Sequence, residues 1–107
     1  MSYTVFLLDT AEKDIESIYR YIRKSGNKTA AIDMLLCLQK ACRSLSENPE
    51  RGHIPVELSQ IGQFEYRQII IKKYRIIYQV AEPNVFIFGI IHGSRNISEV
   101  LRQRVMI

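Results

Sequence analysis

Three runs of Ile, Val, Phe and Tyr follow one another from Phe64 to Arg95, separated only by Lys72-Lys73 and by residues 82–84. Both breaks are too short for a helix but suit tight turns, so the pattern predicts a three-stranded antiparallel meander. A sheet of this size needs an apolar cover on at least one face. We expect the preceding part of the chain to supply that cover.

A short strand and an amphipathic helix are predicted at the start of the chain. Tyr3 to Leu8 has the composition of a strand, and Asp9 follows as a candidate N-cap with Glu12 completing a capping box. Gly26 is expected to end this helix in the left-handed conformation. One face of the helix carries Ile15, Ile18, Tyr19 and Ile22.

A second helix is predicted from about Thr29 to Ser46, before Asn48-Pro49 ends it. Its apolar positions keep the helical period over four turns, and they are Ala31, Met34, Leu35, Leu38, Ala41, Cys42 and Leu45. The two helices should form an antiparallel hairpin. Their apolar faces are expected to pack on the sheet, with Tyr3 to Leu8 joining the meander as a fourth strand.

Residues 49–62 are predicted to be a connecting loop that packs along the surface through Ile54, Val56 and Leu58, and His53 is interpreted as a loop residue. After the meander, Asn96 should cap a short terminal helix with Glu99 three residues later. The apolar side of that helix consists of Ile97, Val100, Leu101 and Val105. The resulting class is α+β, as one domain spanning residues 1–107.

The composition of the chain bears on where the protein is located and on the charge of its partners. The chain is 47% hydrophobic and 24% charged, as in ordinary folded proteins, so long disorder is not expected. No apolar run approaches the roughly 20 residues of a membrane span, and the first residues lack a signal-peptide pattern, so a cytosolic protein is predicted. The net charge of +4 permits an acidic partner, either nucleic acid or protein.

The cysteines and histidines do not predict a metal or a cofactor. Cys37 and Cys42 lie five residues apart on one predicted helix, which points them about 140° apart and prevents a mutual disulfide. His53 and His92 have spacings unrelated to a zinc site. Both cysteines are interpreted as small buried hydrophobic residues.

The candidate functional residues are basic. Arg67, Arg75, His92 and Arg95 lie in or just beyond strands that are otherwise apolar, so they form either a solvated face or an anion-binding or partner-binding surface. A regular hairpin at Lys72-Lys73 would place Arg67 and Arg75 on opposite faces of the sheet, unless a bulge brings them together. Cations near the end of the terminal helix, Arg102 and Arg104, extend the candidate set.

Motifs for other chemistry are absent from the sequence. The chain has no Gly-rich phosphate loop, no HExxH and no serine in a GxSxG turn. Nucleotide hydrolysis and metal-dependent catalysis are therefore disfavoured. What remains is a basic sheet surface that either cleaves RNA by positioning and charge or binds a protein.

Four groups of residues, taken in order, resemble the RelE/ParE superfamily of bacterial type II toxins. They are Ala11-x-x-Asp14-Ile15-x-x-Ile18 with Tyr21-Ile22, Leu45-x-x-x-Pro49-x-Arg51-Gly52 with Pro55-x-Glu57-Leu58, Tyr66-Arg67 with Tyr74-Arg75-x-x-Tyr78, and His92-Gly93-x-Arg95. The resemblance covers nearly the whole chain, and it implies a small α+β fold that agrees with the order of elements predicted above.

The resemblance implies one of two activities. RelE-type members are ribosome-dependent mRNA endonucleases, and Arg67, Arg75 and Arg95 match their basic positions, with His92 as the only plausible general acid or base. Where that branch has a Tyr in the terminal segment, this chain has Leu101, which cannot transfer a proton. ParE-type members poison DNA gyrase by protein contact and need no catalytic residue, and the tyrosine-arginine spacing and the His-Gly-x-Arg ending are typical of them.

Three hypotheses follow from the resemblance. The favoured one is a ParE-like, plasmid-stabilising toxin that inhibits growth by binding gyrase through Arg67, Arg75, His92, Arg95 and the terminal helix. The alternatives are an mRNA interferase acting at the ribosome and an inactive member kept for binding and regulation. All three imply a cognate ParD-like or RelB-like antitoxin, whose disordered acidic segment would fold on the toxin in a hetero-oligomer.

Overall fold

The fold is a four-stranded mixed sheet with helices on both of its faces, in a computed structural model that describes residues 2–105. The strands are β1 (Thr4–Leu7), β2 (Arg67–Ile71), β3 (Tyr74–Ala81) and β4 (Asn84–His92). The helices are α1 (Asp9–Lys24), α2 (Lys28–Ser44), α3 (Val56–Ser59) and α4 (Ile97–Val105), with a 3₁₀ turn at Pro49–Arg51. Within the described residues, no helix is long and apolar enough to span a membrane.

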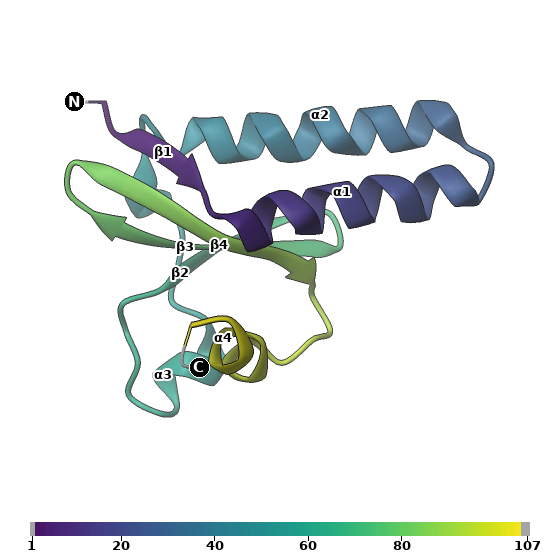
Figure 1. Ribbon diagram of the computed structural model, residues 1–107. Coiled ribbons are helices and arrows are strands. Elements are labelled where there is room, and N and C mark those ends of the chain that lie inside the picture. Colours follow the sequence, from purple (N-terminus) through teal and green to yellow (C-terminus); the bar gives the residue numbers. More distant parts are fainter. Residues whose placement is uncertain (1, 106–107) are drawn as a thin grey trace.

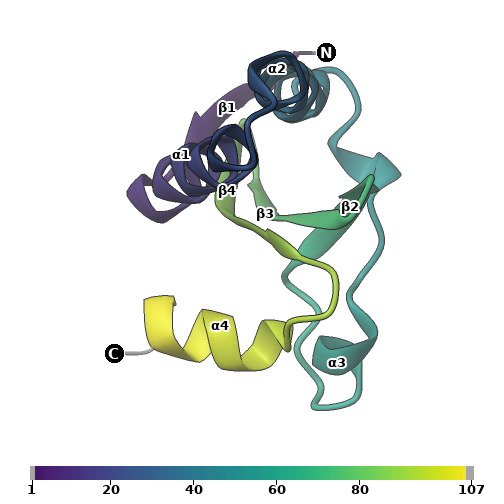
Figure 2. The ribbon, with the colours of Figure 1, turned by 90° about the vertical axis from the view of Figure 1, so that its right-hand side faces the viewer.

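The strand order is β1-β4-β3-β2, with β1 parallel to β4 and the other pairs antiparallel. The α1–α2 hairpin lies along one face of the sheet, and α3 and α4 lie on the other (Figures 1 and 2). The predicted α+β class, the meander and the fourth strand are therefore confirmed. Leu38 is fully buried in the helical hairpin, and Ile18 packs against the same core.

The central strands carry apolar side chains toward both faces. On the α1–α2 side, Ile76, Ile87 and Ile90 join the larger cluster, which also contains Leu38. On the α3–α4 side, the alternate strand residues join a smaller cluster, which consists of Leu58, Tyr66, Ile77, Ile91, Ile97, Val100 and Leu101. The nearly unbroken apolar runs of β3 and β4 follow from this two-sided burial, because successive side chains point to opposite faces.

The helix ends follow the predicted caps with one correction. Gly26 has φ +88°, as expected for the stop of α1, and Asn96 accepts the Glu99 backbone N–H at 3.1 Å at the start of α4. The capping box at Asp9 is wrong. Leu8 is the N-cap and no side chain caps the helix, because Leu8 still donates its N–H to Ile87 O at 3.0 Å as an extension of β1. Asp9 instead lies in the first turn, where a carboxylate meets the helix dipole favourably.

The segment predicted as a loop contains the 3₁₀ turn and α3. Leu58 of α3 is fully buried, as its apolar character predicted, but Val56 is 64% exposed. The side chain of Val105, predicted to join the apolar side of α4, lies outside the described part of the structure. Asn27 caps α2 by accepting the Ala30 backbone N–H at 2.9 Å, so that helix begins at Lys28 and ends at Ser44.

Candidate functional site

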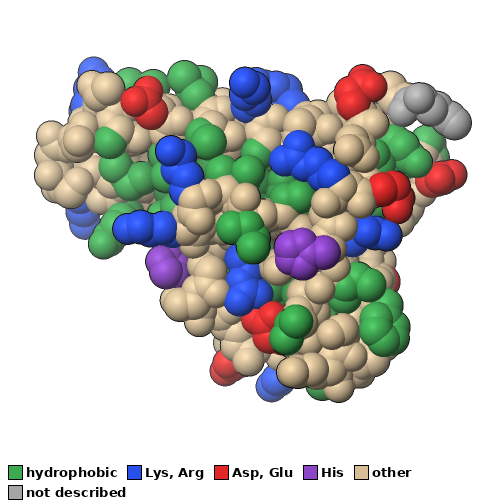
Figure 3. Space-filling model, turned by 180° about the vertical axis from the view of Figure 1, so that it is seen from behind, with side chains coloured by type: hydrophobic (Ala, Val, Ile, Leu, Met, Phe, Trp, Pro, Cys, Tyr) green, Lys and Arg blue, Asp and Glu red, His purple; other side chains and the backbone are tan. Residues whose placement is uncertain are grey.

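A hollow of about 790 Å³ lies between α3, the β2–β3 hairpin and the end of β4. Basic and apolar side chains line it together, among them Val56, Ile70, Lys72, Lys73, Tyr74 and His92. The face containing the hollow shows green and blue side chains between the two histidines (Figure 3). The hairpin tip carries two of these cations because a two-residue turn leaves Lys72 and Lys73 in solvent, with Lys72 at φ 55°.

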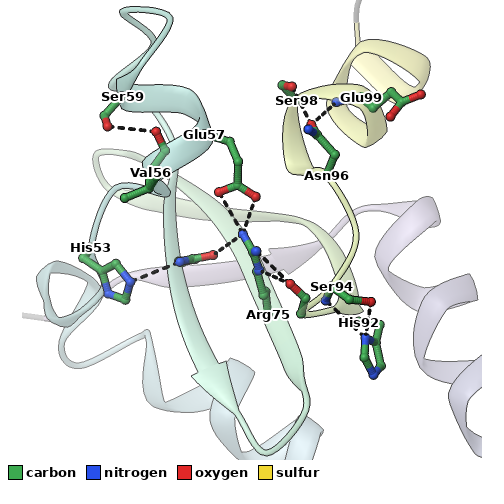
Figure 4. A network of polar contacts seen from close by, with 12 residues as sticks. His53, Val56, Glu57, Ser59, Arg75, His92, Ser94, Asn96, Ser98 and Glu99 are labelled. Carbon is green, nitrogen blue, oxygen red and sulfur yellow. Dashed lines mark hydrogen bonds and ion pairs between the residues drawn. The ribbon is translucent and has the colours of Figure 1, made fainter.

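Arg75 forms the floor of the hollow and joins three segments (Figure 4). Its Nη1 donates to Glu57 Oε1 and Oε2 at 3.0 and 2.8 Å, and its Nε and Nη2 donate to Gly93 O at 3.1 and 2.7 Å. The side chains of Arg75 and Glu57 are only 17% and 24% exposed. Charge-assisted bonds of this kind are strong, so Arg75 holds α3 and the turn after β4 in place.

The hydrogen bonds continue from Arg75 to His53 through Gln68. Gln68 Nε2 lies 3.1 Å from His53 Nε2, and because the amide nitrogen donates, the imidazole nitrogen accepts. The backbones of the same two residues also pair, with Gln68 N–H to His53 O at 2.7 Å and His53 N–H to Gln68 O at 3.0 Å. His53, interpreted from the sequence as a loop residue, is therefore part of the hollow, and its isolated position gave no signal of this.

His92 lies at the rim, where β4 ends. Its ring is edge-on to Tyr74, with ring centroids 6.0 Å apart. Its Nδ1 accepts the Ser94 backbone N–H at 3.2 Å and lies 2.8 Å from Ser94 Oγ, which fixes the orientation of the ring. Burial, and secondarily the nearby Tyr21, raise the pKa of Tyr74, so its phenolate form is even scarcer at neutral pH than that of an ordinary tyrosine.

Arg67 points to the opposite face of the sheet from Arg75. The observed register pairs Arg67 with Tyr78 and Ile70 with Arg75, as the two-residue hairpin predicted. The Arg67 guanidinium donates to Gly52 O at 2.9 Å and pairs with Glu50 at 3.1 Å, so it contacts the 3₁₀ turn at Pro49–Arg51 and the residue that follows it. A bulge does occur in β3, but it lies at Ile77/Tyr78 and faces β4.

Arg104 is joined to α1 by a two-pronged ion pair. Its Nη1 and Nη2 lie 2.7 and 2.9 Å from the two oxygens of Asp14, and both side chains are less than a fifth exposed. Asp14 also accepts the Ile90 backbone N–H at 2.9 Å, beyond the end of β1, where Thr10 Oγ1 donates to Phe88 O at 2.8 Å. This geometry gives Arg104 a structural role, because it ties α4 to α1.

Arg95 and Arg102 are both exposed and lie outside the hollow. Within residues 2–105, neither side chain forms an ion pair. Leu101 is 6% exposed and belongs to the smaller apolar cluster, as its predicted core-facing position required. The structure therefore brings Arg75 and His92 together, and it places Arg67, Arg95, Arg102 and Arg104 elsewhere.

No metal-binding cluster is present in the described part of the chain, where no three His, Cys, Asp or Glu side chains converge. Cys42 is buried and Cys37 is partly buried, and both are free thiols. Burial raises the pKa of the Cys42 thiol to about 11, which keeps it protonated and unreactive as a nucleophile.

The family model of the ParE toxin of the type II toxin–antitoxin system parDE matches residues 5–97 of this chain. The chain belongs to the ParE toxin family. No curated protein matches it. Among solved structures, this ParE-family toxin resembles one described as the chromosomal ParDE toxin–antitoxin system from P. aeruginosa, with a TM-score of 0.71 and 13% identity over 85% of this chain and 96% of that chain.

A second solved structure that this family member resembles is the toxin–antitoxin complex RelBE2 from Mycobacterium tuberculosis. The TM-score is 0.62, and the identity is 20% over 86% of this chain and 92% of that chain. At such identities the two likenesses establish a shared fold. The suspected RelE/ParE superfamily membership is confirmed by the family match together with these neighbours.

Proposed function

We propose that this toxin inhibits DNA gyrase by protein contact and does not cleave RNA itself. The observation that supports this most is the separation of the basic residues. Arg67 and Arg75 lie on opposite faces of the sheet, and Arg95 lies outside the hollow. A phosphoryl-transfer site needs its cations to converge on one reacting phosphate, whereas a contact surface does not.

The contacts that Arg75 already makes, and the lack of a suitable proton donor nearby, also support a contact surface over an RNA-cleaving site. Arg75 already binds Glu57 and Gly93 O, so a phosphate would have to displace a carboxylate that is held by two contacts. Leu101 offers no hydroxyl, and the raised pKa of Tyr74 makes its hydroxyl a weaker acid than that of an ordinary tyrosine. The effector surface we propose therefore consists of exposed groups: His92, Arg95 and Arg102, with Arg75 as its support.

We also propose a cognate antitoxin of the ParD or RelB kind, in an antitoxin-bridged hetero-oligomer. The two solved structures reported above are described as a toxin–antitoxin system and a toxin–antitoxin complex. A basic chain of net charge +4 suits an acidic, initially disordered partner, which would fold on binding.

The test is a supercoiling assay with purified toxin and gyrase, alongside primer extension on ribosome-bound mRNA. We expect supercoiling to be inhibited and the mRNA to stay uncut. Arg95→Ala should relieve inhibition by about tenfold or more, His92→Gln should weaken it only modestly as loss of one rim contact would, and Arg23→Ala on the exposed side of α1 serves as the matched control.

One observation favours the alternative, an mRNA interferase at the ribosome. Arg75, His92 and the hairpin lysines line a single hollow, which could hold a nucleotide. Codon-specific cuts in the ribosomal A site that vanish with His92→Gln would replace the gyrase proposal by this one. Neither inhibition nor cutting, from a folded protein, would instead support an inactive member retained for antitoxin binding.

A further inference from the structure

Two stretches of the chain carry cations and no acid, and the fold brings their turns to one end of the molecule. No Asp or Glu occurs between Glu16 and Asp33, or between Glu65 and Glu82. The turn between α1 and α2 and the turn between β2 and β3 both lie toward the same end (Figure 1). The lysines at these two turns, which we call the tip lysines, are Lys24, Lys28, Lys72 and Lys73. All four are exposed, and among the residues that the structure describes none of them forms an ion pair.

The tip lysines border one groove from two sides. The groove has a volume of about 500 Å³ and separates the helical hairpin from the β2–β3 hairpin. Lys72 and Lys73 line it on the sheet side, and Ile18 and Tyr21 of α1 line it on the helical side. Lys24 lies three residues after Tyr21, so the two side chains are neighbours on the surface of α1.

The helical positions distinguish the tip lysines from a nearby arginine. Lys28 lies on the same side of α2 as buried Ala31 and Leu38, so it points toward the sheet side of the hairpin. Arg23 lies about 160° from Tyr21 around the axis of α1, so it points away from the groove. The cations that can meet one ligand at this end are therefore lysines.

Two of the tip lysines occupy positions where the local backbone favours another residue. Lys28 is the first residue of α2, where the helix dipole favours an anion, and this first turn contains no acid. Lys72 has φ 55°, a left-handed conformation that Gly and Asn adopt more readily. Cations at positions that oppose local stability indicate that the charge serves binding.

We propose that the tip lysines bind the phosphate backbone of duplex DNA without reading its sequence. Lysine is a mobile point charge that suits phosphate, whereas readout of guanine uses the paired donors of arginine. Tyr21 is 75% exposed beside the groove, and its hydroxyl can donate to a phosphate oxygen. The inference goes beyond the proposed function because the ligand is DNA itself. Binding is measured without gyrase, so either proposal can fail alone.

A single-stranded nucleic acid fits this end less well. Binding of unpaired bases relies on several open aromatic faces on which successive bases stack. Of the large apolar side chains that line the groove, Tyr21 is the exposed one. Tyr74 is partly buried, and its ring meets His92 edge-on with centroids 6.0 Å apart. Contacts with the regular phosphates of a duplex require no such stacking.

The experiment follows the fluorescence anisotropy of a labelled duplex of about 20 base pairs, titrated with the full chain at several salt concentrations. We expect dissociation constants of about 1–100 μM near physiological salt, the range of non-specific DNA binding. Four phosphate contacts predict a slope of about −3.5 for the logarithm of the association constant against the logarithm of salt concentration. A duplex of scrambled sequence should give the same affinity and slope.

Variants test the tip lysines against other exposed cations. Lys72→Asn with Lys73→Gln should make the slope shallower by about 2 and weaken binding about tenfold or more at about 50 mM salt. Because Asn suits the positive φ, the melting temperature should not fall. Lys28→Gln should reduce the slope by about 1, also without a lower melting temperature. Lys40→Gln with Arg43→Gln removes two exposed cations about 18 Å or more from Lys28 along α2, and should leave the slope unchanged.

Four results would overturn the proposal. The first is no binding of the duplex at about 50 mM salt and millimolar protein. The second is an equal loss of affinity in the tip variants and in the control pair, which would mean attraction by net charge alone. The third is displacement of the duplex by polyglutamate of matched charge, which would assign the tip lysines to acidic proteins. The fourth is tighter binding of a single-stranded oligonucleotide of equal length.

Discussion

On the face covered by α1 and α2 a large apolar cluster holds the layers together, with the Arg67–Glu50 pair at its edge, whereas on the face covered by α3 and α4 arginine ion pairs hold short segments in place. The first face buries Ile15, Leu38 and Leu45 of the long helices against Ile76 and its neighbours. The second has a smaller apolar cluster, with Glu57–Arg75 at one end and Asp14–Arg104 at the other. A four-residue helix such as α3 cannot be stable alone, so polar contacts fix its position.

This difference bears on where function lies. The hollow and Arg75 belong to the α3–α4 side of the sheet. The exposed histidine at the end of β4 and the two lysines of the hairpin tip lie at its rim, where they also border a groove against Ile18 and Tyr21 of α1. Ion pairs specify geometry, while they add less stability than apolar burial of the same groups would. The α1–α2 face thus supplies most of the folding free energy, and the other face presents a shaped and polar surface.

The largest expected effect on stability comes from truncating a core leucine on each face. Leu38 and Leu58 form a matched pair for this test, because both are fully buried. Leu38→Ala should lower the free energy of unfolding by about 3–5 kcal/mol, because the rigid hairpin and sheet cannot close the cavity. Leu58→Ala should cost about 2 kcal/mol, since the short α3 can shift inward. Urea unfolding of both variants checks this, and equal losses would contradict the proposed difference between the faces.

The second effect concerns Arg104. Replacing it with Gln leaves the Asp14 carboxylate largely buried without its cation, so we expect a loss of about 2–3 kcal/mol in the free energy of unfolding. Asp14→Asn should cost less, because the amide oxygen can still accept the Ile90 N–H. A double-mutant cycle isolates the pair, and Arg102→Gln, at an exposed position of the same helix, serves as the control. A change below that of Arg102→Gln would remove the structural role of Arg104.

The two faces also differ in how far the sequence predicts them. The helical hairpin and the meander have long apolar periods, so their existence, their order and the Arg67–Tyr78 register follow from pattern alone. The error at Asp9 arose because a carboxylate followed by Glu12 satisfies the capping pattern, although the β1 backbone continues through Leu8. Local patterns carry no information on which backbone groups are already paired elsewhere.

The α3–α4 side was predicted less well for the same reason. Residues 49–62 contain Gly and Pro and lack periodicity, so α3 gave no signal beyond buried Leu58. The partners of Arg75 and Arg104 lie 18 and 90 residues away in sequence, and pairing over such distances cannot be inferred from spacing. Asp14 did appear among the residues shared with the toxin superfamily, which is the one available hint of its role.

A third expected effect is a loss of stability at alkaline pH, and it arises from Cys42 in the apolar cluster on the α1–α2 face. Burial raises the pKa of Cys42 from 9.0 to about 11, so between these values the unfolded thiol loses its proton while the folded thiol keeps it. Stability is therefore unaffected below pH 9 and should fall as the pH rises, by about 1 kcal/mol near pH 10. Cys42→Ala lacks this titration, so its stability should decline less over the same range. Parallel pH profiles for the two proteins would contradict the assignment.

Substitution of Arg95 should have the smallest effect on stability. The same substitution should have the largest effect on activity. The side chain is exposed, and within residues 2–105 it forms no ion pair, so Arg95→Ala should change the free energy of unfolding by less than about 1 kcal/mol. Arg75→Ala should cost more, because it leaves Glu57 and Gly93 O without their donor. Thermal unfolding of both variants, read beside growth inhibition on induced expression, distinguishes a contact residue from a supporting one. If Arg95→Ala lowers the melting temperature as much as Arg75→Ala does, then Arg95 stabilises the fold and its place in the proposed effector surface is lost.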